Sequence, residues 1–219
     1  MSIWRAILTT IIYILLLGAA TAWIFLDEDF SWPKWIYDYF ELLATSLELL
    51  AVLLYLYFVN RDQGFHFGKC PAYYYPYALL FGLSYVFIQI PLNKLYYYFF
   101  DYYYEIQFMY NPERLLTPFF WSVVVLGPIG EELLFRGHIQ RRLQLRYHPV
   151  VAISVATLLF ALIHLNILWA FYDIDFLNPH HVYITIFGGM ISGILYYLSK
   201  SIGPSIIYHM AWNFMATLF

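Results

Sequence analysis

Long apolar stretches, each about the length of a membrane-crossing helix, dominate this sequence and leave few folds open to it. A transmembrane helix needs about 20 mostly apolar residues. Hydrophobic residues make up 63% of the chain and charged residues only 11%, whereas a soluble domain carries about 25% charged residues. The sequence therefore predicts an all-α fold, a polytopic transmembrane helix bundle with about seven spans. The predicted spans are 4–26, 36–59, 73–99, 115–136, 150–171, 181–199 and 202–219.

Charge and cysteine content exclude several classes of function. The formal net charge is −3 and no domain is basic, so nucleic acid is not an expected partner. Cys70 is the single cysteine, which rules out an intramolecular disulfide and a cysteine-based metal cluster. The lipid bilayer is the partner that the composition predicts most directly.

Lysine and arginine residues predict how the bundle is oriented, because cytoplasmic loops carry an excess of both. With the N-terminus in the cytoplasm and alternating spans, eight of the 11 basic residues fall inside and three outside. We therefore expect a cytoplasmic N-terminus. The inside set is Arg5, Arg61, Lys69, Arg136, Arg141, Arg142, Arg146 and Lys200, and the outside set is Lys34, Lys94 and Arg114.

Ionisable side chains inside membrane spans are costly and by default mark a functional site. Glu132 and Arg136 are four residues apart, so they can pair on one face of a helix. Glu131 is rotated by about 100° from Glu132 and is left to face elsewhere. Glu41 and Glu48 are a second acidic pair on one helix face. They are compatible equally with a substrate path and with neutral acids hydrogen-bonded inside the bundle.

Depth along the helices predicts that several of these polar groups meet. Residues 127–130 (Gly-Pro-Ile-Gly) are expected to break the fourth span, because proline removes a backbone donor. A hairpin centred on residues 147–148 then places Glu131 level with His164. The next hairpin brings His209 to about the same depth, with Asn213 one turn further on. The predicted site lies in the inner half of the membrane, with a cavity open to the cytoplasm.

Three motifs on successive apolar helices resemble those of a known family. They are Glu131-Glu132-x-x-x-Arg136 followed by Gly137, Phe160-x-x-x-His164, and His209-x-x-x-Asn213. In this order they resemble the CPBP family, the CAAX prenyl endopeptidases and related bacterial proteins of bacteriocin processing and self-immunity. The resemblance covers residues 115–219. It divides the chain into N-terminal transmembrane helices (1–114) and a catalytic CPBP-like helical core (115–219).

The resemblance implies hydrolysis of a peptide bond within the membrane. Carried over by position, Glu131 would be the catalytic carboxylate and His164 its partner, and the two would activate a water molecule. His209 and Asn213 would bind the developing oxyanion. The residues that would support the site are Glu132, Arg136 and Phe160. Phe160 would exclude water, and plain packing explains its position equally well.

Metal dependence is left open by the residues themselves. Two histidines and a carboxylate form a known zinc set of peptidases, and Glu131, His164 and His209 could supply one. The chain has no His-Glu-x-x-His motif, and an asparagine is a poor zinc ligand but a good hydrogen-bond donor. We therefore favour a reaction without a cofactor, with zinc as the alternative.

The expected substrate is a membrane-associated or prenylated CAAX-type peptide, or a bacterial leader peptide, cleaved by an enzyme of a bacterial plasma membrane. A second hypothesis is a non-catalytic immunity or scaffold protein that binds a peptide or a membrane protein. A third is a small proton-coupled transporter that uses the buried carboxylates as a relay. A transporter predicts internal repeats, and the sequence shows none.

Overall fold

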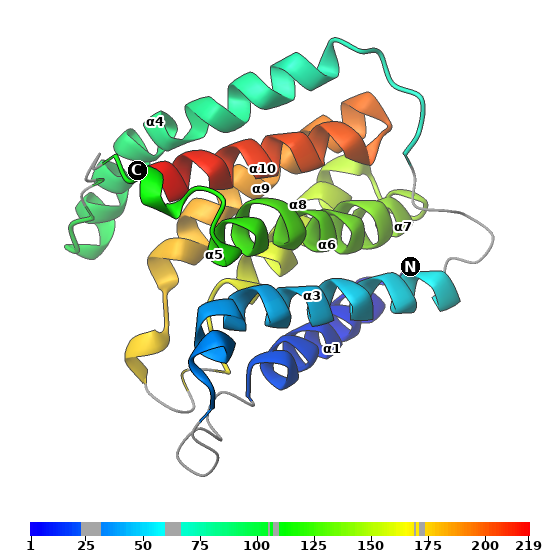
Figure 1. The fold of residues 1–219 in the computed structure, drawn as a ribbon. Coiled ribbons are helices and arrows are strands. Elements are labelled where there is room, and N and C mark those ends of the chain that lie inside the picture. Colours follow the sequence, from blue (N-terminus) through cyan, green and yellow to red (C-terminus); the bar gives the residue numbers. More distant parts are fainter. Residues whose placement is uncertain (23–31, 60–66, 105, 107–109, 169, 171–173) are drawn as a thin grey trace.

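Long helices account for most of the chain that the structure describes, and the all-α bundle predicted from the sequence is confirmed (Figure 1). The computed structural model describes residues 1–22, 32–59, 67–104, 106, 110–168, 170 and 174–219. Within these residues, seven long helices follow one another along the chain. They are α1 (Ile3–Ala22), α3 (Lys34–Val59), α4 (Tyr74–Phe100), a composite helix (Pro118–Gln144), α8 (Pro149–Ile163), α9 (Pro179–Ser199) and α10 (Ile202–Leu218). Residues 23–26, where the first predicted span ends, lie outside the described residues, as does Arg61.

Five helical stretches in the described part of the chain are long and apolar enough to cross a membrane. They are α1, α3, α4, the composite helix and the stretch Ile174–Ser199, which contains α9. Inside a bilayer a helix satisfies its own backbone hydrogen bonds, which is why apolar stretches of this length become helices. The chain is therefore an integral membrane protein. α8 and α10 are shorter, with 15 and 17 residues.

Successive helices run antiparallel, so the bundle has two distinct ends (Figure 1). At one end the Met1 amino group donates to the Arg142 carbonyl, at 3.0 Å, and the Arg142 guanidinium donates to the Val59 carbonyl, also at 3.0 Å. Because Lys200 also lies at this end, we call it the basic end. At the opposite end the Asn111 amide donates to the Leu218 carbonyl at 3.0 Å. The N-terminus therefore lies at the basic end and the C-terminus at the opposite end.

The composite helix corrects one expectation, because it is not broken at residues 127–130. Leu126 and Gly127 keep helical dihedral angles, with φ of −72° and −55°. Two π-helical segments, Trp121–Leu126 and Leu133–Gln140, flank the short α-helical turn Gly127–Glu132. The first of them ends with the Gly127 amide donating to the Ser122 carbonyl five residues back. Pro128 is thus the first residue beyond a wide turn and fits without breaking the helix. The remaining segments are α5 (Pro118–Phe120), α6 (Gly127–Glu132) and α7 (Arg141–Gln144).

The fifth helix ends eight residues earlier than predicted. α8 stops at Ile163 instead of 171, and His164 is its C-cap residue. Asn166 has a left-handed backbone with φ of 58°, which a helix cannot continue. The apolar residues beyond this point gave no hint of a boundary, because the helix ends through backbone conformation and not through polarity.

α9 packs closely against its neighbours along a face of small residues. A methyl group added to Gly188 would lie 2.5 Å from the Trp212 ring. One added to Gly189 would lie 2.9 Å from the Phe160 ring, and one added to Gly193 3.0 Å from the Gln140 side chain. Small residues let membrane helices approach each other in this way. α9 can therefore reach the centre of the bundle, where it contributes Ser192.

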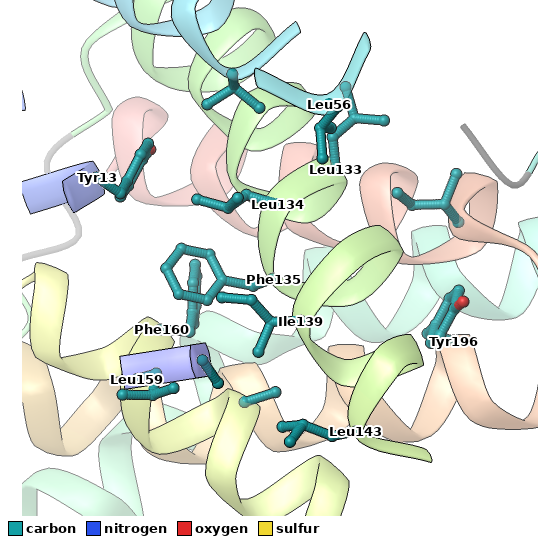
Figure 2. Close-up of a cluster of buried hydrophobic side chains, with 14 of the residues drawn as sticks. Tyr13, Leu56, Leu133, Leu134, Phe135, Ile139, Leu143, Leu159, Phe160 and Tyr196 are labelled. Atoms are coloured by element: carbon teal, nitrogen blue, oxygen red, sulfur yellow. The ribbon is translucent and has the colours of Figure 1, made fainter. Parts of the chain in front are cut away.

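The buried core lies between the composite helix and α8 (Figure 2). Figure 2 shows Phe135 facing Phe160. The ring centroid of Phe135 lies 5.4 Å from that of Phe160 and 5.8 Å from that of Tyr13, and both pairs pack edge to face. Ile139 and Leu143 continue the cluster toward the basic end, and both are completely buried. This core holds the polar residues of the composite helix in fixed positions.

Candidate active site

The four residues predicted to be catalytic face one cavity of about 510 Å³ in the interior of the bundle. Glu131 comes from the middle of the composite helix, and His164 from the end of α8. His209 and Asn213 come from successive turns of α10. The depths estimated from the sequence predicted that these side chains meet, and in the structure all four line this cavity. Glu131 and His164 also line a second, adjoining cavity of about 210 Å³.

A buried network lies directly beneath this cavity and is centred on Glu132. One carboxylate oxygen of Glu132 is 3.3 Å from Arg136 Nε and accepts a hydrogen bond from the Ser192 hydroxyl at 2.8 Å. The other oxygen is 3.2 Å from Nδ1 of His209. Glu132 and Arg136 are 1% and 0% exposed. The pairing expected from their spacing is therefore present, and both oxygens of Glu132 are occupied.

The network also sets the orientation of His209. A carboxylate can only accept, so Nδ1 of His209 is the donor to Glu132. The ring then directs Nε2 toward Glu131, whose nearer carboxylate oxygen is 3.8 Å away. Both oxygens of Glu132 therefore have partners in the buried network, whereas the carboxylate of Glu131 faces the cavity.

Phe160 and His164 are coupled through one turn of α8. Nδ1 of His164 is 3.0 Å from the Phe160 carbonyl, which can only accept, so Nε2 of His164 keeps a lone pair for the cavity. The Phe160 ring lies 4.9 Å from the His164 ring and 5.6 Å from the His209 ring. It also lies 4.9 Å beneath the Arg136 guanidinium. Phe160 therefore separates the buried ion pair from the cavity.

The side chain of Asn213 is hydrogen-bonded to the Val123 carbonyl, which lacks a partner within its own helix because Pro128 has no N–H. The Gly127 amide bonds to Ser122 five residues back, and the next residue in that register would donate to Val123. That residue is Pro128, which has no N–H. The amide of Asn213 donates to the Val123 carbonyl instead, at 2.8 Å. This bond fixes the side chain and leaves its second N–H available to the cavity.

We expect Asn213→Ala to lower the free energy of unfolding by about 1–3 kcal/mol, because the Val123 carbonyl loses its donor. Adding Pro128→Ala should recover most of that stability, since alanine supplies an N–H in the right register. The double variant should nevertheless remain as inactive as Asn213→Ala. Thermal unfolding in detergent and a cleavage assay on all three variants measure the two effects separately. Equal stability of Asn213→Ala and wild type would contradict the tether.

Two residues near the site were not foreseen from the sequence. Ser192 carries no motif of its own, although its place in the small-residue face of α9 could have drawn attention to it. His181 belongs to none of the three motifs. It lies in the first turn of α9, lines the cavity, and its ring is 4.9 Å from that of His164. The signal was Asn178-Pro179, since Asn178 caps the helix by accepting from the His181 amide at 2.9 Å.

Two of the three acidic residues of α3, Glu41 and Glu48, line the cavity. Glu41 is exposed, and Glu48 is buried and accepts a hydrogen bond from the Tyr13 hydroxyl. The hydrogen bond of Glu48 inside the bundle agrees with the second interpretation of this pair, and the substrate path stays a prediction. α3 contributes an acidic wall to the cavity, and one member of that wall is tied to α1.

The zinc set considered from the sequence does not form in this geometry. Among the described residues, no three histidine, cysteine, aspartate or glutamate side chains are arranged to hold a metal ion. His209 directs one nitrogen to Glu132, and its other nitrogen lies 3.8 Å from Glu131.

Comparison with known proteins defines the class to which this arrangement corresponds. Residues 113–215, which include all three motifs, match the family model of type II CAAX prenyl endopeptidase Rce1-like proteins. The family resemblance drawn from the motifs is confirmed for this part of the chain.

A particular relative is the UPF0177 protein YbdI of Lactococcus lactis subsp. lactis (strain IL1403). It is 32% identical to this chain over 97 residues, which are 44% of this chain. The matched region spans 46% of the relative's own length, slightly less than half of it. No solved structure matches this chain.

Proposed function

We propose that this protein is an intramembrane endopeptidase that hydrolyses a peptide bond with a water molecule activated by Glu131 and His164. The observation that carries the proposal is the convergence of four polar side chains, from three helices, on one cavity within a membrane bundle. The Rce1-like family match over the same residues supports it. The expected substrate is a membrane-associated peptide, of which a prenylated CAAX-type peptide is the family's example.

The reaction begins with a water molecule between Glu131 and Nε2 of His164. Glu131 removes a proton, and the resulting hydroxide attacks the carbonyl carbon of the scissile bond. The carbonyl oxygen becomes an oxyanion in the tetrahedral intermediate. The proton held by the site then passes to the leaving nitrogen as the C–N bond breaks, so the products are a carboxylic acid and an amine.

Two donors are placed to stabilise the oxyanion. The free N–H of Asn213 can donate without rearrangement, because the Val123 carbonyl already fixes its amide. Nδ1 of His209 donates to Glu132, so Nε2 donates only when both ring nitrogens carry hydrogen. Preorganised donors of this kind are a large part of the rate enhancement in acyl transfer, and losing one costs about 10²–10³ in rate.

Cleavage by the purified protein in liposomes tests the proposal directly. Candidate membrane peptides are incubated in ¹⁸O-labelled water with wild type or Glu131→Ala, and the products are analysed by mass spectrometry. We expect paired fragments, with label in the new carboxylate, from wild type alone. Peptide that binds to both proteins and is cleaved by neither would instead favour the non-catalytic immunity or scaffold function.

Metal removal separates the two possible ways of activating water. We expect 1,10-phenanthroline or EDTA to leave cleavage nearly unchanged after long incubation. Elemental analysis should find far less than one zinc ion per chain, and His209→Ala and Asn213→Ala should lower turnover by similar factors. Stoichiometric zinc that is lost in His164→Ala, with activity restored by zinc in stripped wild type, would decide against this mechanism.

A further inference from the structure

The described residues that line the cavity of the candidate site lie in the half of the bundle away from the basic end. On the composite helix its lining extends from Phe119 to Glu131, and on α10 from His209 to Thr217. On α3 it extends from Glu41 to Glu48. On each of these helices the lining begins near the end opposite the basic end and stops in mid-helix. The exposed lining residues lie in the same half and are Glu41, Arg114, Phe119, His181 and Ala216.

Below the site, the route to the basic end is filled by packed side chains. Arg136, Ile139 and Leu143 occupy successive turns of the composite helix and are completely buried. Between them the Gln140 side chain donates to the Gly193 carbonyl of α9 at 2.8 Å. Ile202, at the start of α10, is also completely buried. A peptide can therefore reach Glu131 from the opposite end and not from the basic end.

The charge distribution determines which compartment each end faces. Arg136 is buried in the ion pair with Glu132, so we leave it out of the basic residues that indicate orientation. Of the nine other basic residues that the structure describes, six lie at the basic end and three at the opposite end. The excess of lysine and arginine places the basic end in the cytoplasm. The sequence analysis expected both a cytoplasmic N-terminus and a cavity open to the cytoplasm, but the N-terminus and the cavity lie toward opposite ends of the bundle. The distribution of lysine and arginine favours the cytoplasmic N-terminus.

We infer that the site is entered from the extracytoplasmic side and acts on peptide segments presented there. The substrate class is a translocated peptide, or the outer juxtamembrane segment of a membrane-anchored one. A prenylated tail that stays in the cytoplasm would meet the packed end of the bundle. The substrate class rests on the proposed function, whereas the sidedness of the cavity can be tested without it.

Single cysteines in a Cys70→Ser background test the sidedness in intact cells with a membrane-impermeant maleimide. Ala216→Cys reports the cavity mouth, and Glu113→Cys reports the same end outside the cavity. Leu145→Cys, 73% exposed at the basic end, is the matched control. We expect full labelling of positions 216 and 113 in intact cells, and labelling of position 145 only after permeabilisation. The reverse pattern overturns the inference, as does a position 216 that stays unlabelled in intact cells while position 113 reacts.

Vesicles of known orientation then test the substrate side. We expect a cleavable peptide to be cleaved when it is added outside right-side-out vesicles. The same peptide should not be cleaved when it is added outside inverted vesicles. Cleavage by inverted vesicles alone would overturn the inference. Cleavage by neither would count against the proposed endopeptidase, and the labelling of position 216 would still decide the side on which the cavity opens.

Discussion

Glu131→Gln is expected to lower peptide cleavage by about 10²- to 10⁴-fold, the usual contribution of a general base. The substitution keeps the size of the side chain and removes only its ability to take a proton. Glu131 is 18% exposed, and Nε2 of His209 is 3.8 Å from its carboxylate, so we expect the substitution to leave the fold intact. Initial rates on a peptide substrate, with thermal unfolding in detergent as the check on folding, measure the effect.

The matched control for this variant is Glu113→Gln, which makes the same chemical change. Glu113 lies in the short 3₁₀ turn Pro112–Arg114, is exposed, and does not line the cavity. Its substitution should leave both rate and stability unchanged. Wild-type turnover by Glu131→Gln would remove this carboxylate as the base and direct attention to His164.

Arg136→Ala is expected to lower the free energy of unfolding by about 3–5 kcal/mol, because breaking a buried pair leaves an uncompensated charge. Glu132 would keep its bonds to Ser192 and His209 but lose the guanidinium charge beside it. Phe160 would also lose the guanidinium stacked on its ring. Thermal unfolding of the purified protein in detergent measures the loss.

An exposed arginine and a double variant complete this experiment. Arg146→Ala, at the surface of the basic end, should change stability little. Replacing the whole pair, as in Glu132→Leu with Arg136→Met, should be less damaging than Arg136→Ala alone, because no unpaired charge remains. The double variant should still be inactive, since His209 loses the partner of its Nδ1. Unchanged stability of Arg136→Ala would contradict the bracing role.

The helices and the convergence of the site could be predicted because both follow from simple spacing. A long apolar stretch in a bilayer has no alternative to a helix. The four-residue spacing of Glu132 and Arg136 places them on one face, and hairpin arithmetic aligns Glu131 with His164. None of these inferences depends on side-chain packing, which the sequence does not display.

The predictions that were wrong concern features that depend on side-chain packing or on backbone geometry. Residues 127–130 do not break the helix, because a π-helical turn accommodates Pro128. His138 belongs to none of the three motifs, yet it is 1% exposed and 3.3 Å from the Tyr55 hydroxyl. Arg136 was counted with the loop residues although it is completely buried. The side on which the cavity opens depends on which end the core fills, and no local pattern reveals that.

The early end of α8 has a consequence for the bilayer itself. Its 15 residues span about 22 Å, roughly 8 Å less than the 30 Å hydrocarbon core of a typical membrane. Lipids beside a short helix compress to match it, at a modest cost per ångström. His164 lies where this helix ends, so the bilayer should be thinnest beside the residues that activate the water molecule. A thinned annulus shortens the path that water must travel to reach the scissile bond, and thicker bilayers should slow hydrolysis.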